Sequence, residues 1–220
     1  MQANINISTL KAVSLAASSE ETRYYLKGVY IEVTPATVTY TATNGHILLS
    51  RREDCAEPNT LTGAWIIPAD FIKSAKPARG TDYAAMVTVP GANDSQMLAF
   101  TGTITGMCAP IAGTFPDYRR IVPETADGIA AQYDGAYTGL FAKFAKAIGG
   151  NYAHIHHNGD SAAPVTFNRQ GTFGVIMPLR SEHTNVDGAW NKTQALFSPD
   201  ENEAAAQPAQ EQEQPAQAQA

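Results

Sequence analysis

The side chains that could support metal or acid–base chemistry lie close together in the second half of the chain. His154, His156 and His157 stand near Asp160, and alternate residues of a strand point to the same side, so a metal site is one interpretation. No second group of ligands accompanies them, and we favour an ordinary strand-to-turn surface. We recognise no Ser-His-Asp arrangement, phosphate-binding glycine loop or paired-carboxylate motif in the sequence. We therefore predict a protein that is not an enzyme and uses no cofactor or metal.

A second stretch, residues 114–123, has residue types suited to binding. The run Thr-Phe-Pro-Asp-Tyr-Arg-Arg-Ile-Val-Pro places two aromatic rings, two guanidinium groups and an apolar pair in a segment bracketed by prolines. Pro116 restricts Phe115 to an extended conformation and Pro123 ends any strand before it, so we predict a stiff, extended connector. Such a connector suits a seam between two packed units. The alternative is an inert interdomain linker.

Lysines recur on the three segments that we predict to be helical. The positive residues are Lys11 in the first, Lys73, Lys76 and Arg79 in the second, and Lys143 and Lys146 in the third. Asp70 stands at the start of the second segment. If the helices share one side of a sheet, that side is a positive surface suited to phosphate groups. The alternative is that lysines are simply good, solvated helix formers.

Composition limits the class of protein. A formal net charge of −6 over 220 residues argues against a surface that wraps nucleic acid on all sides. Two cysteines are too few for a disulfide framework, and no secretory segment opens the chain, so we predict a cytoplasmic location. No apolar run approaches the ~18 residues needed to cross a bilayer. From Pro199 onward the chain is almost entirely Ala, Gln, Glu and Pro, which predicts a disordered acidic tail.

Hydrophobic periodicity and turn signals predict three successive β-α-β-β-β cycles. The first cycle has strands at 3–7, 24–33, 37–43 and 46–51, a helix that Ser8 would cap, and a turn at Asn44-Gly45. The second has strands at 64–67, 86–89, 97–101 and 103–109 and a helix at 68–74. The third has strands at 129–133, 152–156, 165–168 and 174–177 and a helix at 137–148 that ends at Gly149-Gly150.

Several blocks of this sequence resemble the bacterial sliding clamp, the β subunit of DNA polymerase III. They are residues 24–30 with 43–46, residues 114–123, and residues 175–180. The resemblance covers residues 5–180, which correspond to the middle domain plus the last half of the third domain of the family. It suggests a shortened and divergent member of the kind that phages carry. It implies an α+β fold of repeated β-α-β-β-β units, with antiparallel sheets outside and helices lining a hole around duplex DNA. The implied division is a complete clamp domain at 1–113, the connector at 114–123, a half domain at 124–190 and the tail at 191–220.

The resemblance also implies a groove between the middle and last domains that binds short Gln-Leu-Phe-type peptides of polymerases, clamp loaders and repair factors. The matching positions are Leu26, Thr43, Gly45, His46, Leu48, Pro116, Arg120, Ile121, Val175, Met177, Pro178, Leu179 and Arg180. Met177 and Leu179 would offer adaptable apolar surface, while the arginines would donate to peptide carbonyls. The alternative is that these residues only join two packed units. Asn44 and Ile47 depart from the family, which commonly has Asp and Arg there, so the choice of partner can differ.

Contacts with double-stranded DNA are implied in the same way. Five lysines would face phosphates without reading sequence, and two tyrosines match loop residues that touch DNA in the family. These residues are Lys11, Lys73, Lys76, Lys143 and Lys146, with Tyr24 and Tyr25. The alternative for the tyrosines is that they pack at a sheet edge.

Assembly follows from the repeat. Rings of the family hold twelve such units and we predict three here, so four chains would supply twelve, and we expect a homo-oligomer. One hypothesis is a processivity factor that tethers a polymerase to DNA. The other is an adaptor or decoy that captures clamp-binding peptides without encircling DNA. Gln194-Ala195-Leu196-Phe197 itself resembles such a peptide and could dock in a groove or serve as a simple apolar anchor.

Overall fold

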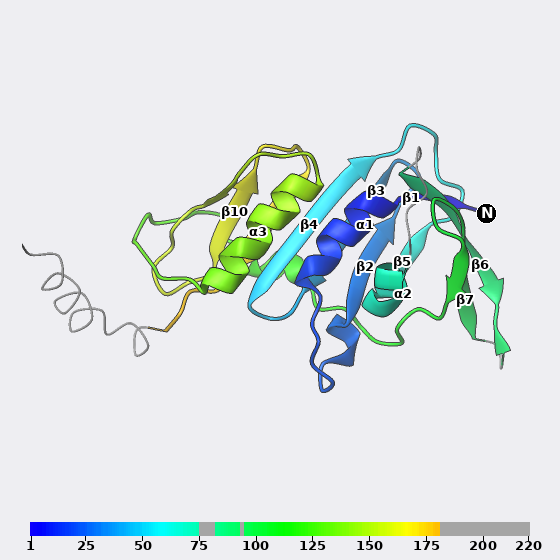
Figure 1. The fold of residues 1–220 in the computed structure, drawn as a ribbon, viewed down its shortest axis with the longest axis horizontal. Helices are drawn as coiled ribbons and strands as arrows, with labels where there is room; N and C mark the ends of the chain where they lie inside the picture. Colours follow the sequence, from blue (N-terminus) through cyan, green and yellow to red (C-terminus); the bar gives the residue numbers. More distant parts are fainter. Residues whose placement is uncertain (75–81, 93–94, 181–220) are drawn as a thin grey trace, which may run out of the picture. The chain divides into compact units, whose positions relative to one another are not determined.

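Two antiparallel sheets organise the computed structural model, which describes residues 1–74, 82–92 and 95–180 (Figure 1). The first unit consists of β1 (Ala3–Asn6), α1 (Ile7–Val13), β2 (Gly28–Val33), β3 (Thr37–Thr43) and β4 (Ile47–Asp54). The second consists of β5 (Gly63–Pro68), α2 (Ala69–Ser74), β6 (Tyr83–Pro90), β7 (Gln96–Gly102) and β8 (Gly106–Cys108). The third consists of α3 (Gly135–Ala147), β9 (Ala153–Ile155), β10 (Ala163–Phe167) and β11 (Thr172–Ile176). Short 3-10 turns lie at Ser14–Ala16, Tyr24–Leu26 and Tyr118–Ile121.

The first and second units exchange their opening strands. β1 pairs with β6 of the second unit, and β5 pairs with β2 of the first, both antiparallel. The strand orders are β1-β6-β7-β8 in the smaller sheet and β5-β2-β3-β4-β11-β10-β9 in the larger one. β4 pairs antiparallel with β11, with Leu48 opposite Val175, so the first and third units share a continuous seven-stranded sheet.

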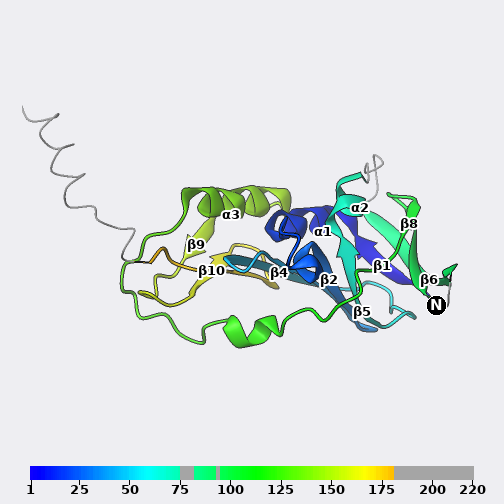
Figure 2. The same cartoon turned by 90° about the horizontal axis from the view of Figure 1, so that it is seen from below.

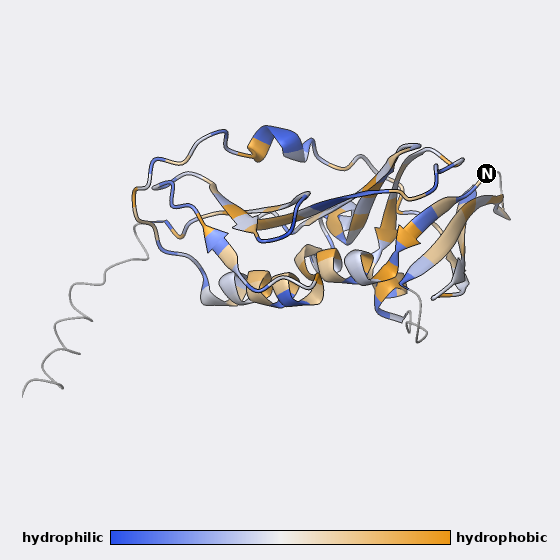
Figure 3. Cartoon of the chain, turned by 90° about the horizontal axis from the view of Figure 1, so that it is seen from above, coloured by the Kyte–Doolittle hydropathy of each residue, from blue (hydrophilic) through white to orange (hydrophobic). Residues whose placement is uncertain are grey.

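The helices cover one face of the sheets, and the connector crosses the other face of the larger sheet (Figure 2). Side chains of β2 alternate between the two faces, as expected for a strand. Val29, Ile31 and Val33 join the main core with Leu10 and Phe141, whereas Tyr30 packs on the connector side. Helices α1 and α3 mix hydrophobic and hydrophilic residues along their length, as amphipathic surface helices do (Figure 3).

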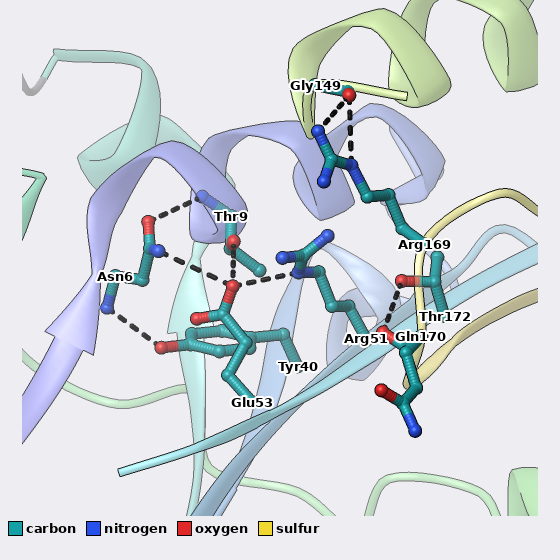
Figure 4. Close-up of polar contacts among 9 residues, drawn as sticks. All are labelled: Asn6, Thr9, Tyr40, Arg51, Glu53, Gly149, Arg169, Gln170 and Thr172. Atoms are coloured by element: carbon teal, nitrogen blue, oxygen red, sulfur yellow. Dashed lines mark hydrogen bonds and ion pairs between the residues drawn. The ribbon is translucent and has the colours of Figure 1, made fainter. Parts of the chain in front are cut away.

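A polar network attaches α1 to the larger sheet (Figure 4). The Asn6 side chain accepts the Thr9 N–H at 3.0 Å and caps the helix, because a side-chain oxygen there satisfies a free helical donor. The carboxylate of Glu53 on β4 accepts the Thr9 hydroxyl at 2.7 Å and the Arg51 Nε at 2.8 Å. The prediction that Ser8 caps this helix is wrong, since the Ser8 hydroxyl donates to Asp82 instead.

Local signals predicted the turns and helix ends well. Asn44-Gly45 connects β3 to β4: Gly45 has φ of 92°, and the Asn44 side chain accepts the N–H groups of His46 and Ile47. Asp134 caps α3, and Gly149 follows it with φ of 70°, so the predicted helix stop is confirmed. Thr37–Thr43 is a strand over the predicted residues.

Five other predictions are wrong. Residues 24–26 form a 3-10 turn, so the strand predicted at 24–33 begins only at Gly28. Pro68 ends β5 and does not open α2, and the last strand of the second unit is shorter than predicted. The connector is not wholly extended, because Tyr118–Ile121 forms a 3-10 turn. Residues 129–133 belong to neither sheet, so the third cycle lacks its first strand.

Part of the prediction lies outside the described residues. This applies to Lys76 and Arg79 on the second helical segment, to the end of the half domain predicted at 124–190, to the Gln194–Phe197 motif and to the tail at 191–220.

Candidate peptide groove and nucleic-acid face

The connector is attached to the larger sheet by stacking and hydrogen bonds. Phe115 stacks on Tyr30 of β2 with ring centroids 4.8 Å apart and planes 3° apart. The Tyr118 hydroxyl donates to Glu32 Oε2 at 3.0 Å. The Ile111 N–H, just before the connector, donates to the Ile66 carbonyl at 2.9 Å. The connector is therefore part of the packed structure and not an inert linker.

The charges around Glu32 favour a neutral tyrosine beside an ion pair. Arg119 Nη2 lies 2.6 Å from Glu32 Oε2, and its guanidinium carbon lies 4.6 Å from the centre of the Tyr118 ring. Burial, more than any other cause, raises the pKa of the Tyr118 hydroxyl above its ordinary value. The hydrogen bond that the Arg119 guanidinium donates to the Glu32 carboxylate raises the pKa of Arg119. Tyr118 thus remains a hydrogen-bond donor and Arg119 a cation at neutral pH.

Buried members of the predicted groove come together beneath the connector. Leu26, Leu48 and Val175 pack with three residues that the prediction omitted, and we call these six the connector cluster. Its members are Leu26, Leu48, Ile66, Phe115, Tyr118 and Val175. Phe115 and Tyr118 meet edge to face with ring centroids 6.4 Å apart. They are the two aromatic residues of the connector, and they could have been added from the sequence on that ground, since the connector was predicted to lie at a seam between packed units.

The other members of the predicted groove are mostly exposed. Ile121, Met177 and Leu179 are 49%, 44% and 38% exposed, unusually open for large apolar side chains. The Met177 N–H donates to the His46 carbonyl at 2.8 Å, which holds the segment after β11 against the β3–β4 turn. Also exposed are Gly45, His46, Pro116, Arg120 and Arg180, while Pro178 is half-buried.

Two residues of the β3–β4 hairpin support the backbone and do not face outward. Thr43 is buried, and its hydroxyl donates to the Ile47 carbonyl at 2.7 Å. Ile47, which replaces the arginine common in the family, is 2% exposed and belongs to the main core. A contact that sequence reasoning missed is the stacking of His46 on Tyr137 of α3, with ring centroids 5.7 Å apart.

A cavity elsewhere shows that shape alone does not identify the groove. A cavity of about 320 Å³ is lined by Tyr40, Glu53, Cys55 and Tyr83, among others. It lies at the start of β3 and the end of β4, the opposite ends from Thr43 and Leu48. We therefore base the groove on the connector cluster and the exposed residues around it.

The helix-bearing face carries the lysines. Within the described helices α1, α2 and α3 there are four lysines and one acid, Asp70. Lys73 lies 3.5 Å from Asp70, with 72% of its side chain exposed, and Lys143 and Lys146 are exposed on α3. Lys11 is half-buried near the end of α1.

Tyr24 and Tyr25 occupy the 3-10 turn between α1 and β2. Their rings meet edge to face with centroids 5.7 Å apart, and both lie close to Gly113, just before the connector. Tyr24 is exposed and Tyr25 half-buried. Neither is in a strand, so the strand part of the alternative is wrong. Tyr25 nevertheless packs against the connector cluster.

The histidines make ordinary polar contacts on the third unit. His154 and His156 have ring centroids 4.6 Å apart, and His156 Nε2 shares a 2.8 Å hydrogen bond with the Thr166 hydroxyl. His157 Nδ1 accepts the Ala131 N–H at 3.3 Å. Across residues 1–74, 82–92 and 95–180, no group of three or more His, Cys, Asp or Glu is arranged to hold a metal ion.

Comparison with known structures defines the class of protein. A DNA polymerase III subunit beta from Pseudomonas aeruginosa superposes with a TM-score of 0.63 at 20% identity, covering 82% of this chain and 66% of that one. A DNA polymerase sliding clamp from Bacillus subtilis gives 0.66 at 14% identity, covering 82% and 64%. The fold is that of the sliding clamps, an α+β fold, as predicted.

Sequence comparison gives the family. Residues 2–117 match the model for the central domain of the DNA polymerase III beta subunit, and the chain belongs to that family. The "Beta sliding clamp" of Pseudomonas aeruginosa is 30% identical over 114 residues, which are 52% of this chain and 30% of that protein. That of Pseudomonas putida is 30% identical over 125 residues, or 54% and 32%. The match thus spans about a third of the length of these curated relatives.

Membership in this family agrees with the prediction that the chain is not an enzyme. None of the helices in the described parts of the chain is both long and apolar enough to cross a membrane.

Proposed function

We propose that this chain is a shortened sliding clamp that tethers partner proteins to duplex DNA through a groove for short peptides. The observation that carries the proposal is the connector cluster, in which segments far apart in the sequence meet. Leu26 precedes β2, Leu48 and Val175 lie opposite each other on β4 and β11, and Phe115 and Tyr118 come from the connector. The family relationship supports the same assignment.

The exposed residues around the cluster suit an apolar peptide with polar backbone groups. Met177, Leu179 and Ile121 provide apolar surface, and methionine adapts its shape easily to different side chains. Arg120 and Arg180 are exposed and can donate to peptide carbonyls or to an acidic residue. An extended Gln-Leu-Phe segment has this combination of apolar side chains and amide groups.

The test is a double substitution of the exposed apolar residues. Met177→Ala with Leu179→Ala should weaken binding of a labelled Gln-Leu-Phe peptide by roughly 10- to 100-fold, because two apolar contacts are lost. Fluorescence anisotropy measures the affinity, and circular dichroism checks the fold. The matched control is Met107→Ala with Leu15→Ala, which makes the same chemical changes at exposed positions elsewhere. Equal affinity of both double variants would refute the groove.

The helix-bearing face is the proposed DNA side. α1, α2 and α3 lie on the same face of the sheets, and their lysines outnumber their acids (Figure 2). Lysine contacts with phosphates carry no sequence information, which suits a protein that moves along duplex DNA. Tyr24 and Tyr25 would add contacts from the turn before β2.

An adaptor or decoy that holds clamp-binding peptides off DNA is the second candidate. The incomplete third unit favours it, because the described chain does not supply the half domain that would continue the sheet beyond β9. Retention on nicked circular DNA separates the two candidates. A clamp that surrounds DNA stays on the circle and is lost after linearisation, whereas an adaptor binds the peptide equally well and is not retained on either form.

A further inference from the structure

The first two units show how a unit of this chain is completed. Each sends the strand before its helix to the other unit, and in both cases the residue next to the helix lies opposite the first residue of the receiving strand. Asn6 lies opposite Tyr83, and Pro68 lies opposite Gly28. One position further from the helix, Ile5 lies opposite Ala84 and Ile67 opposite Val29, and all four are fully or almost fully buried.

The third unit has neither part of this exchange. β9, which corresponds to β2 and β6, is the last strand of the seven-stranded sheet, and no strand within residues 1–74, 82–92 and 95–180 pairs with its outer edge. Residues 129–133, which precede α3 as β1 precedes α1, belong to neither sheet. The third unit therefore offers one open strand edge and one unpaired segment, both within the chain.

The residues at these two places resemble those of the completed exchange. Asp134 caps α3 as Asn6 caps α1, so Tyr133 and Ala131 correspond to Ile5 and Ala3. Ile129 extends the apolar alternation by one more position. On the receiving side, Tyr152, Ala153 and Ile155 correspond to Tyr83, Ala84 and Met86.

Burial shows that this part of the core is open. Ala84 and Met86 are almost completely buried, whereas Ala153 and Ile155 are only partly buried against the main core. Ile129 is 62% exposed and Tyr152 is 58% exposed. Leu140 and Ile148, on or next to α3, are also only partly buried.

We propose that a second copy of this chain completes the third unit by reciprocal strand exchange about a two-fold axis. Residues 129–133 of each copy pair antiparallel with β9 of the other. In the expected register Tyr133 lies opposite Ala153 and Ala131 opposite Ile155, which places apolar side chains together on the core side. A two-fold axis satisfies both open parts at once, because each copy gives one segment and receives one.

In the single chain, residues 128–132 are held by a few bonds beyond the end of β9. The Gly128 N–H donates to the His157 carbonyl and the Gly159 N–H to the Ile129 carbonyl, each at 3.0 Å. The Leu179 N–H donates to the Gln132 carbonyl at 2.8 Å. In the exchanged dimer, a regular strand ladder replaces these bonds and covers Ile129. The single chain and the dimer are therefore alternative arrangements, and a higher protein concentration favours the dimer.

Disulfide trapping in trans tests the register. Gln132 and His154, both exposed, would lie opposite each other, and residues opposite each other in an antiparallel pair have Cα atoms at a distance that a disulfide spans. Chains with Gln132→Cys should form a mixed disulfide with chains carrying His154→Cys. The matched control is Thr166→Cys on β10, which is exposed, lies opposite His154 and is one strand further from the edge. Peptide mapping separates this disulfide from any made by Cys55 or Cys108. If Gln132→Cys chains form a mixed disulfide with Thr166→Cys chains as readily as with His154→Cys chains, the register is overturned.

Proline substitution tests the ladder without a cross-link. The His156 N–H donates to the Pro164 carbonyl on β10. Because backbone groups of successive strand residues point to opposite sides, those of Ala153 and Ile155 point to the open edge. Ala131→Pro then removes a ladder donor, whereas Gln132→Pro removes an N–H that points away from β9. We expect the wild-type chain and Gln132→Pro to be dimers or larger even-numbered assemblies by light scattering, and Ala131→Pro to shift towards the monomer. A wild-type chain that stays monomeric at tens of micromolar, or equal masses for the two proline variants, would overturn strand exchange.

Discussion

Replacing Phe115 by alanine should release the connector from the sheet. Phe115 is 8% exposed and stacks on Tyr30. Truncating a buried Phe costs about 3–5 kcal/mol in a closed core, including the cavity that remains. Here the connector lies on the outside of the sheet and Tyr30 is only partly buried, so the site can collapse around the missing ring. We therefore expect a loss of about 2–3 kcal/mol in the free energy of opening the connector.

Trypsin measures that opening directly, because Arg119 and Arg120 lie in the 3-10 turn next to Phe115. When opening is faster than cleavage, the cleavage rate follows the equilibrium population of the open form. A change of about 2–3 kcal/mol then predicts cleavage that is roughly 30- to 150-fold faster. Mass spectrometry of the first fragments locates the cut.

The matched control is Ile121→Ala, which shortens an apolar side chain on the same connector but at a half-exposed position. This change should alter the cleavage rate by no more than about twofold, since exposed substitutions are usually worth less than ~0.5 kcal/mol. An unchanged rate in Phe115→Ala would show that the ring does not attach the connector. The groove would then lose its structural basis.

Two further predictions concern DNA and the cysteines. Exchanging Lys73, Lys143 and Lys146 for Glu should weaken duplex binding and flatten its dependence on salt, because fewer counterions are released. The control is Arg52→Glu, a charge reversal at an exposed position on β4. An unchanged salt slope in the lysine variant would show that the helices do not face DNA. Burial raises the pKa of the Cys108 thiol to about 11, and its residue is 8% exposed. At pH 8 the thiolate is therefore scarce, so alkylation of Cys108 should be slow and should accelerate about tenfold per pH unit up to that pKa while the fold persists. Peptide mapping after timed alkylation measures the rate of Cys108 labelling. Rapid labelling at pH 8 that does not accelerate at higher pH would contradict this prediction.

Sequence reasoning worked where the signal is local. Asn44-Gly45 and Gly149 mark a turn and a helix stop because their own side chains, or the absence of one, decide the backbone conformation. The capping residue of α1 was missed because Asn6 and Ser8 are both good caps, and the choice depends on contacts of Ser8 with Asp82. Within the groove, the sequence could not separate Thr43, which supports the hairpin, from Met177, which faces outward.

The sequence by itself determined the family, the repeat of helix and strands, and the segments that could form a groove, because these depend on residue types and short spacings. Only the tertiary structure decided which strands pair, namely the exchange of β1 and β5 and the joining of β4 to β11. It also decided that Phe115 and Tyr118 of the connector pack against the larger sheet. The predicted strand at 129–133 shows the physical reason. Its residues alternate as a strand requires, but a strand also needs a free neighbouring edge to bond to, and that edge is set by the rest of the fold or by a second chain.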